Sequence, residues 1–394
     1  MKDYWEEPKR KSLDKKKMTI IICTIILIAL FIVIGVLYRQ NRPTRNWIDR
    51  NILQKEKTQN NLPSIELGES RDTKIYAFNK YIGLLSKNIF DIYDSTGKKQ
   101  KELKLEITKP IFASNNRYLV VAEEKGKKLY VIEDKEIIWE KDIEGNISAV
   151  TVNKNGYVAV NIVDTSYKTV IAMFDNQGEQ LFNTYLSTTR VVATSISNDN
   201  KYLAIAELDT SGTILQSNIK VISIEEGKND PTNSIKKIYN GENNELVTNI
   251  KYQDKNKLLC MYNDKITLIK EDEAVETLQE YEDKKTDFAS IDLSNAIVTV
   301  EEKPSGIFTV DSIVNIINSE NKSSSIYNTD SITKEVYTKD NIIALNLGSE
   351  VEFVNNSGWL VKKYVAEQEI TSIVISNAIA GIVYRDKIEI INLW

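Results

Sequence analysis

The chain has 394 residues with 51 basic and 56 acidic side chains and no histidine, so its formal net charge is −5. The lack of histidine excludes Ser-His-Asp and Cys-His catalysis, HExxH zinc sites and histidine-ligated haem or copper. Residues 1–57 hold 13 basic and 6 acidic residues, which leaves 38 basic and 50 acidic residues in the remainder. This acidic remainder argues against nucleic acid as a partner, because nucleic acid attracts basic surfaces.

Residues 1–17 form a basic tail with seven Lys or Arg residues and four acidic residues. One interpretation is a solvated, disordered segment. The other is a recruitment tail for a cytoplasmic partner or for anionic lipid.

Residues 18–38 carry no charge and are long enough to cross the ~30 Å hydrocarbon core of a bilayer. The run is too long for the apolar region of a signal peptide and lacks a small-x-small cleavage site, so an uncleaved signal anchor is expected. Seven basic residues precede it, and Arg39, Arg42, Arg45 and Arg50 follow. This bias predicts a single-pass cell-membrane protein with a cytoplasmic N-terminus and an extracytoplasmic C-terminal domain.

Residues 39–61 read as a polar juxtamembrane linker. Trp47, Ile48, Ile52 and Leu53 would share one face of a short helix lying on the membrane surface. An irregular stalk is the alternative.

Residues 62–394 contain a repeat whose clearest copy is SNDNKYLAIAEL, Ser197–Leu208: a polar turn followed by a short apolar strand. The aligned first residues of these strands span 297 residues in seven intervals, a mean of about 42, which is typical of propeller blades. The apolar runs are short, rich in Val, Ile and Tyr, and bounded by turn residues, so they predict strands. The aligned residues are Tyr81, Tyr118, Tyr157, Tyr202, Leu258, Ala296, Ile342 and Ala378.

Each copy has one strand before it and two after it, which gives a four-stranded antiparallel blade. The last repeat, from Ile370, has only three strands, and an open ring would leave an exposed edge. Ser64–Leu67 is the candidate for the missing outer strand. We therefore predict an all-β, eight-bladed propeller closed by an N-terminal strand, with seven blades as the alternative.

The sequence offers few groups for chemistry. Cys23 lies in the apolar run, and Cys260, within a predicted strand, is expected to be a buried hydrophobic residue. Asp199, Asp254 and Asp340 precede the strands of three repeats; they are either turn residues or carboxylates for metal binding or catalysis. No catalytic, cofactor-binding or metal-binding residue is assigned, and no cofactor is expected.

The turns DSTG (Asp94–Gly97) and DNQG (Asp175–Gly178), with Trp139 and Trp359 in or beside outer strands, resemble pyrroloquinoline-quinone-type propeller repeats. SNDNKYLAIAEL also resembles WD40-like and TolB-like blades. With its apolar run, the chain resembles an uncharacterised family of single-pass propeller proteins from Gram-positive anaerobes. The quinone enzymes use a disulfide of adjacent cysteines, which this chain lacks, so the resemblance implies no cofactor site.

From these features we expect a non-catalytic, membrane-anchored interaction scaffold with an envelope or membrane protein as its partner. Two other functions stay open. One is an enzyme that uses carboxylates at the central mouth to act on an envelope glycan or peptide. The other is a sensor that signals through the span.

Overall fold

A computed structural model of the chain describes residues 15–58, 62–68, 72–163, 166–242, 245–254, 257–270, 275–281, 286–304 and 310–394. These residues form two units, an N-terminal unit that ends at Glu56 and a second unit that begins at Lys57. The predicted basic tail lies almost entirely outside the described residues, so its role stays a prediction.

The first unit begins with helix α1 (Lys15–Gln40), which contains the predicted apolar run. Its 26 residues give a length of about 39 Å, more than the thickness of a bilayer core. The apolar side chains from Met18 to Leu37 are exposed. By length and composition this helix can cross a membrane, and a membrane anchor and a signal sequence both meet that description.

A short helix, α2 (Arg42–Asn51), follows α1, so the linker is helical over this part. Asn41 caps its start, and the Tyr38 hydroxyl at the end of α1 donates to Asp49 at 2.6 Å. Lys55 Nζ lies 3.0 Å from the same carboxylate oxygen, and Asp49 is only 4% exposed. The end of α1 is thus fixed to α2 by a buried polar cluster. Of the apolar residues predicted to share a face, three are exposed: Trp47, Ile52 and Leu53.

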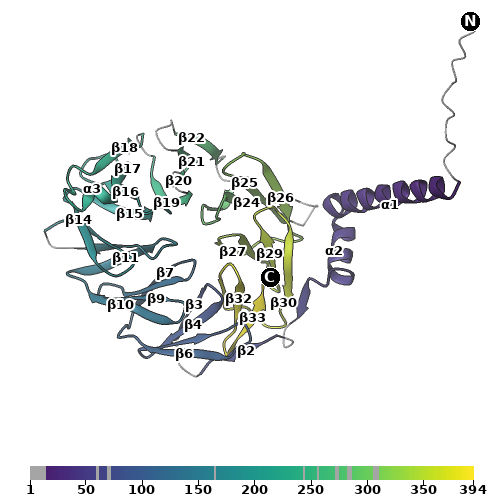
Figure 1. Ribbon diagram of the computed structural model, residues 1–394, viewed down its shortest axis with the longest axis horizontal. Helices are drawn as coiled ribbons and strands as arrows, with labels where there is room; N and C mark the ends of the chain where they lie inside the picture. Colours follow the sequence, from purple (N-terminus) through teal and green to yellow (C-terminus); the bar gives the residue numbers. More distant parts are fainter. Residues whose placement is uncertain are drawn as a thin grey trace, which may run out of the picture. The chain divides into compact units, whose positions relative to one another are not determined.

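The second unit is an eight-bladed β-propeller, as predicted, and its sheets surround a common centre (Figure 1). Seven blades use four consecutive strands that pair in chain order. The first four are β3 (Lys74–Phe78), β4 (Tyr81–Ser86), β5 (Ile89–Tyr93) and β6 (Lys99–Lys104); β7 (Pro110–Asn115), β8 (Tyr118–Glu123), β9 (Lys128–Glu133) and β10 (Glu136–Asp142); β11 (Asn146–Val152), β12 (Val158–Val163), β13 (Thr169–Phe174) and β14 (Gln180–Leu186); and β15 (Thr189–Ile196), β16 (Tyr202–Asp209), β17 (Gln216–Ser223) and β18 (Ile235–Asn240), with the one-turn helix α3 (Ile224–Gly227) after β17.

The remaining blades continue this order. They are β19 (Val247–Asp254), β20 (Lys257–Tyr262), β21 (Lys265–Lys270) and β22 (Glu276–Glu280); β23 (Thr286–Ser290), β24 (Ala296–Pro304), β25 (Val310–Asn318) and β26 (Ser324–Asn328); β27 (Glu335–Lys339), β28 (Ile342–Asn346), β29 (Glu350–Asn355) and β30 (Leu360–Val365), with β1 (Glu56–Thr58) at the outer edge; and β31 (Ser372–Ile375), β32 (Ile379–Val383) and β33 (Lys387–Asn392).

The eighth blade is completed by β2 (Ser64–Glu66), which lies within the segment predicted to close the ring. This strand pairs antiparallel with β33, with Ser64 opposite Glu389 and Ile65 opposite Ile388. Ile65 is 3% exposed and packs in a core shared by the eighth and first blades. The chain therefore closes the propeller by joining its two ends in one sheet.

The pattern of burial explains why the second strands read as apolar runs. In β4 and β8 the first five residues are all buried, because these strands lie between neighbouring sheets. The outer strands β6 and β10 bury only isolated side chains. Cys260 on β20 is fully buried, as expected, and its burial raises the pKa of the thiol. The core thus consists of apolar layers between successive blades.

The two D-x-x-G turns each pack against the outer strand of the preceding blade. Gly178 has a φ of +80°, and an added Cβ would lie 2.8 Å from the Trp139 ring on β10. Gly97 has a φ of +76°, and its Cβ would lie 2.6 Å from the Ser64 carbonyl oxygen on β2. Glycine is required at both positions by the backbone conformation and by the close approach.

A buried carboxylate network fastens the eighth blade to the seventh. Glu389 on β33 is 1% exposed and accepts a hydrogen bond from the Tyr364 hydroxyl on β30 at 2.8 Å. Lys387 Nζ lies 2.7 Å from its other oxygen, and the Tyr384 hydroxyl lies 2.5 Å from that of Tyr364. Burial and these bonds raise the pKa of Tyr364, so the hydroxyl stays protonated and donates.

Two other blades carry the same kind of network, with a buried glutamate between a lysine and a hydroxyl. Such groups are tolerated inside a protein only when their hydrogen bonds are satisfied. The glutamates are Glu207 on β16, which contacts Lys220 at 2.7 Å and Thr189 at 2.7 Å, and Glu352 on β29, which contacts Lys363 at 3.6 Å and Tyr327 at 2.9 Å.

Candidate functional site at the mouth of the central channel

The innermost strands end at a polar cavity of about 480 Å³ on the axis of the ring. All eight blades contribute to its wall, through the ends of their first strands and the turns that follow. One lining residue from each blade, in chain order, is Tyr76, Asn115, Thr151, Ser195, Lys251, Asp292, Lys339 and Asn377.

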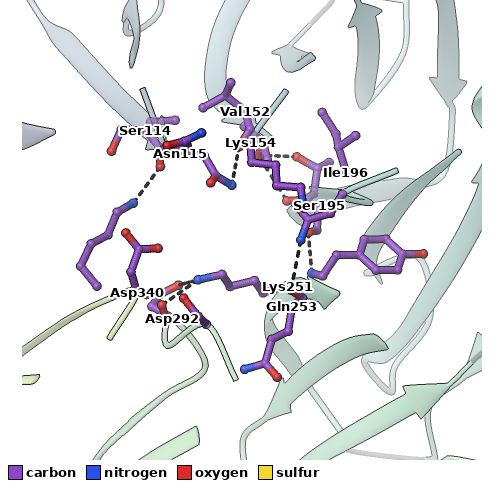
Figure 2. Close-up of a pocket in the computed structure, with 18 of the residues that line it drawn as sticks. Ser114, Asn115, Val152, Lys154, Ser195, Ile196, Lys251, Gln253, Asp292 and Asp340 are labelled. Atoms are coloured by element: carbon purple, nitrogen blue, oxygen red, sulfur yellow. Dashed lines mark hydrogen bonds and ion pairs between the residues drawn. The ribbon is translucent and has the colours of Figure 1, made fainter. Parts of the chain in front are cut away.

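Lys251 extends from β19 into the opening, toward Asp292 and Asp340 (Figure 2). Its Nζ donates to the backbone carbonyl of Asp292 at 2.7 Å and lies 4.0 Å from the Asp292 carboxylate. The side chain is 24% exposed. Burial lowers the pKa of Lys251 below its ordinary value; the charge of Lys339 acts in the same direction, and the two carboxylates oppose it. Lys251 is thus a partly desolvated cation that a ligand can reach.

Lys339, at the end of β27, reaches to the second blade. Its Nζ donates to the backbone carbonyl of Ser114 on β7 at 2.7 Å. Lys154 also lines the cavity and is exposed. Among the described lining residues, three lysines therefore face two carboxylates, in a propeller that is acidic as a whole.

The carboxylates singled out from the sequence occupy different environments. Asp199 accepts hydrogen bonds from the Ser197 hydroxyl at 2.8 Å and the Lys201 amide at 3.3 Å, so it closes its own turn. Asp340 lines the mouth, while the side chain of Asp254 lies outside the described residues. The turn interpretation fits Asp199, and Asp340 belongs to the candidate site.

Asp292 was not identified from the sequence, yet its backbone organises this side of the mouth. Its carbonyl accepts from Lys251 Nζ at 2.7 Å and from the Asp340 amide at 3.1 Å. The Asp340 carbonyl in turn accepts from the Ser294 amide at 2.6 Å, and Asp340 has a φ of +51°. These backbone bonds join the sixth and seventh blades and fix where Lys251 ends.

Amide side chains connect the turns around the mouth from one blade to the next. Asn153 donates to the carbonyl of Ser197 at 2.9 Å, and Asn198 donates to that of Gln253 at 3.0 Å. Gln253 then donates to the carbonyl of Leu293 at 2.9 Å. Four successive blades are thereby held in register, so the wall of the cavity is formed before any ligand arrives.

A second cavity of about 430 Å³ adjoins the mouth, and its wall is more apolar. The two cavities share four lining residues: Tyr76, Asn249, Asp292 and Lys339. The apolar residues of the second cavity come from the first blade and from the fifth to eighth blades, and include Ala77, Met261, Phe288, Val336, Ile373 and Ile375.

The part of the chain that the structure describes contains no evident metal-binding cluster. No group of three or more His, Cys, Asp or Glu residues is placed there to hold a metal ion. The mouth can instead offer hydrogen bonds and charge, from ammonium groups, carboxylates and amides.

The repeat pattern does not identify the lysines at the mouth, because its copies align on the second strand of each blade. Lys251 and Lys339 lie on the first strands, at different distances from the aligned residues Leu258 and Ile342. Lys251 is the fifth of the eight residues of β19, whereas Lys339 is the last residue of β27, so no fixed position in the strand marks both lysines.

Several solved structures are similar to this chain. BamB from Moraxella catarrhalis is similar with a TM-score of 0.47 at 12% identity, over 83% of this chain and 97% of that chain. Apo AztD from Citrobacter koseri gives 0.47 at 12% identity, over 76% and 86%. The Dos1 propeller gives 0.49 at 12% identity, over 78% and 83%. Similarity of fold at this level assigns no activity.

No curated protein matches the sequence. Residues 53–393 match the profile of a family described as a family of unknown function, DUF5711.

Proposed function

The chain belongs to the DUF5711 family, and we propose that it is a non-catalytic interaction scaffold whose central mouth holds a segment of a protein partner. The observation that carries this proposal is the preformed polar wall of the mouth. Hydrogen bonds connect its turns from one blade to the next, so its hydrogen-bond donors and acceptors occupy fixed positions. A rigid site loses little conformational entropy on binding, which favours recognition of an extended segment.

We further propose that α1 anchors the propeller outside the cytoplasmic membrane. The support is an apolar helix long enough to span a bilayer and the excess of basic residues before it over those after it. The partner would then be an envelope or membrane protein.

Topology is tested on the full chain with an N-terminal tag, expressed in cells. We expect it to stay in the membrane after alkaline washing, and we expect protease added to spheroplasts to digest the propeller while sparing the tag. Release of a chain shortened beyond Leu37 would show a cleaved signal sequence, and digestion of the tag would show the opposite orientation.

The scaffold role is tested by capture on the full chain in detergent, exposed to solubilised membranes and to wall fragments. Asn377 lies exposed at the mouth, so Asn377→Trp should block entry. Lys104→Trp places the same side chain at an exposed position of the outer strand β6, away from the mouth. We expect one membrane protein in fixed proportion, lost with Asn377→Trp and kept with Lys104→Trp. Equal capture by both variants would rule out the mouth as the binding site.

One observation favours a second candidate, a carboxylate-dependent enzyme: Asp292 and Asp340 both line the mouth beside Lys251. Two carboxylates can act as acid and base or nucleophile on a glycan. Turnover of wall fragments by the full chain, abolished by Asp340→Asn, would replace the scaffold proposal with this one.

A further inference from the structure

The two deep lysines of the mouth keep donors for a ligand. An ammonium group has three N–H donors. In the part of the chain described, Lys251 has the Asp292 carbonyl as its hydrogen-bond acceptor, and Lys339 has the Ser114 carbonyl. The nearest carboxylate oxygen to Lys251 is 4.0 Å away, too far for a hydrogen bond. Both cations are held by neutral carbonyls, so their charge is incompletely compensated.

The sign of the charge at the mouth differs from that of the propeller around it. Residues 58–394 hold 38 basic and 50 acidic residues, whereas the described residues that line the mouth include three lysines and two aspartates. Lys339 also lowers the pKa of Lys251, which means that the two cations repel each other. The carboxylates of Asp292 and Asp340 act on Lys251 in the opposite direction, and an added anionic group that accepts from the remaining N–H donors of the two lysines would further offset this repulsion.

The rest of the wall suits a polypeptide. Asn116, Asn341 and Asn377 are exposed at the mouth, and each amide side chain presents both a donor and an acceptor. Main-chain N–H and C=O groups of an extended segment need this combination.

The second cavity can hold an apolar part of the ligand. Lys339 and Asp292 line both cavities, so the second cavity adjoins the space that would hold the anionic group. An adjoining apolar side chain would then enter the space lined by Phe288, Val336 and Ile373.

We propose that the mouth recognises a carboxylate on an extended peptide segment, with Lys251 and Lys339 holding the carboxylate and the second cavity receiving an adjacent apolar side chain. This inference rests on the proposed function, because it names the chemistry of the segment that the scaffold binds. The carboxylate is either the end of a chain or an acidic side chain.

The test uses the full chain in detergent and three heptapeptide libraries with acetylated N-termini and random apolar and polar positions. The first library has free C-terminal carboxylates, the second is amidated, and the third is amidated with one fixed Glu. Peptides retained by the protein are quantified by mass spectrometry. We expect retention from the first or the third library at least tenfold above the second, and the difference between these two identifies the source of the carboxylate.

Variants then assign the carboxylate to the lysines. Loss of a charge-assisted hydrogen bond weakens binding by about tenfold to a hundredfold. We expect a loss of this size with Lys251→Met and with Lys339→Met, and none with Lys104→Met, which removes the same charge from β6. Matching melting temperatures of the variants show that each is folded.

The two possible failures are distinguishable. Equal retention of all three libraries, blocked by Asn377→Trp but unaffected by the lysine variants, would overturn the carboxylate inference and leave the scaffold proposal standing. Retention of no library, together with capture of the partner unaffected by Asn377→Trp, would overturn both.

Discussion

The propeller contains two kinds of buried charge, and they differ in how completely they are paired. Glu389 between the seventh and eighth blades is 1% exposed and contacts Lys387 and a tyrosine hydroxyl within 2.8 Å. Lys251 in the mouth is 24% exposed, and the nearest carboxylate oxygen among the described side chains is 4.0 Å away. The first arrangement is complete within the protein, whereas the second leaves room for another molecule. The difference separates charge that stabilises the ring from charge available for binding.

The largest effect is expected from Glu389→Ala. Removing one partner of a buried ion pair leaves the other charge uncompensated, which typically costs about 3–5 kcal/mol. We expect the free energy of unfolding to fall by this amount in denaturant titrations. Glu140→Ala, on the exposed side of β10, is the control and should change it by less than about 0.5 kcal/mol. A Glu389 variant as stable as this control would remove the distinction between the two kinds of charge.

Tyr364→Phe should have a smaller effect in the same direction. It removes the hydroxyl that donates to Glu389 at 2.8 Å and keeps the ring and the carboxylate. A hydrogen bond to a charged group contributes about 1.5–3 kcal/mol, so we expect a loss in this range by the same titration. Stability equal to that of the unsubstituted protein would mean that Lys387 alone satisfies the carboxylate.

Lys251→Met should separate stability from binding. Methionine keeps the length of the side chain and removes a partly desolvated charge without a close carboxylate partner. We expect the free energy of unfolding to change by less than about 1 kcal/mol, in contrast to Glu389→Ala. A loss as large as that of Glu389→Ala would place Lys251 among the structural charges.

The smallest expected effect is a change with pH in the difference in free energy of unfolding between Lys251→Met and the unsubstituted protein. The pKa of Lys251 is below its ordinary value of 10.5 in the folded protein, mainly because of burial. The unfolded chain therefore binds more protons between the two pKa values, and Lys251 contributes more favourably to stability as the pH rises toward 10.5. Any stability advantage of Lys251→Met should be largest at neutral pH and should shrink as the pH rises from the lowered pKa of Lys251 toward 10.5. An advantage that grows over this range would contradict a lowered pKa.

The fold could be predicted because the second strand of each blade lies between two sheets and buries both faces. Such strands read as short apolar runs that begin after a polar turn, and β8, β16 and β28 begin at the aligned residues Tyr118, Tyr202 and Ile342. The need to pair the last open edge likewise predicted the closing strand, which the pairing of Ile65 with Ile388 confirms.

The site could not be predicted because the register of the first strands depends on the length of the turn after them. In the second blade only Asn116 and Arg117 separate the first two strands, whereas residues 153–157 do so in the third. Aligning the second strands therefore misaligns the residues that line the mouth. The buried position of Glu389 could not be predicted for another reason. A charged residue between Ile388 and Ile390 is typical of the exposed face of a strand, but β33 is covered on both faces.

The closing strand also determines how the propeller responds to mechanical load. Along the chain, α1 leads to the ring through β1 and β2, and β2 is the strand that pairs with β33. β1 precedes β2 and pairs with β30 at the outer edge of the seventh blade, so tension along the chain from α1 would reach the seventh blade first and the eighth blade second. Both strands are only three residues long, so a sufficient pull would detach β1 and then β2, and the eighth blade would open at its outer edge, away from the innermost strands that line the mouth.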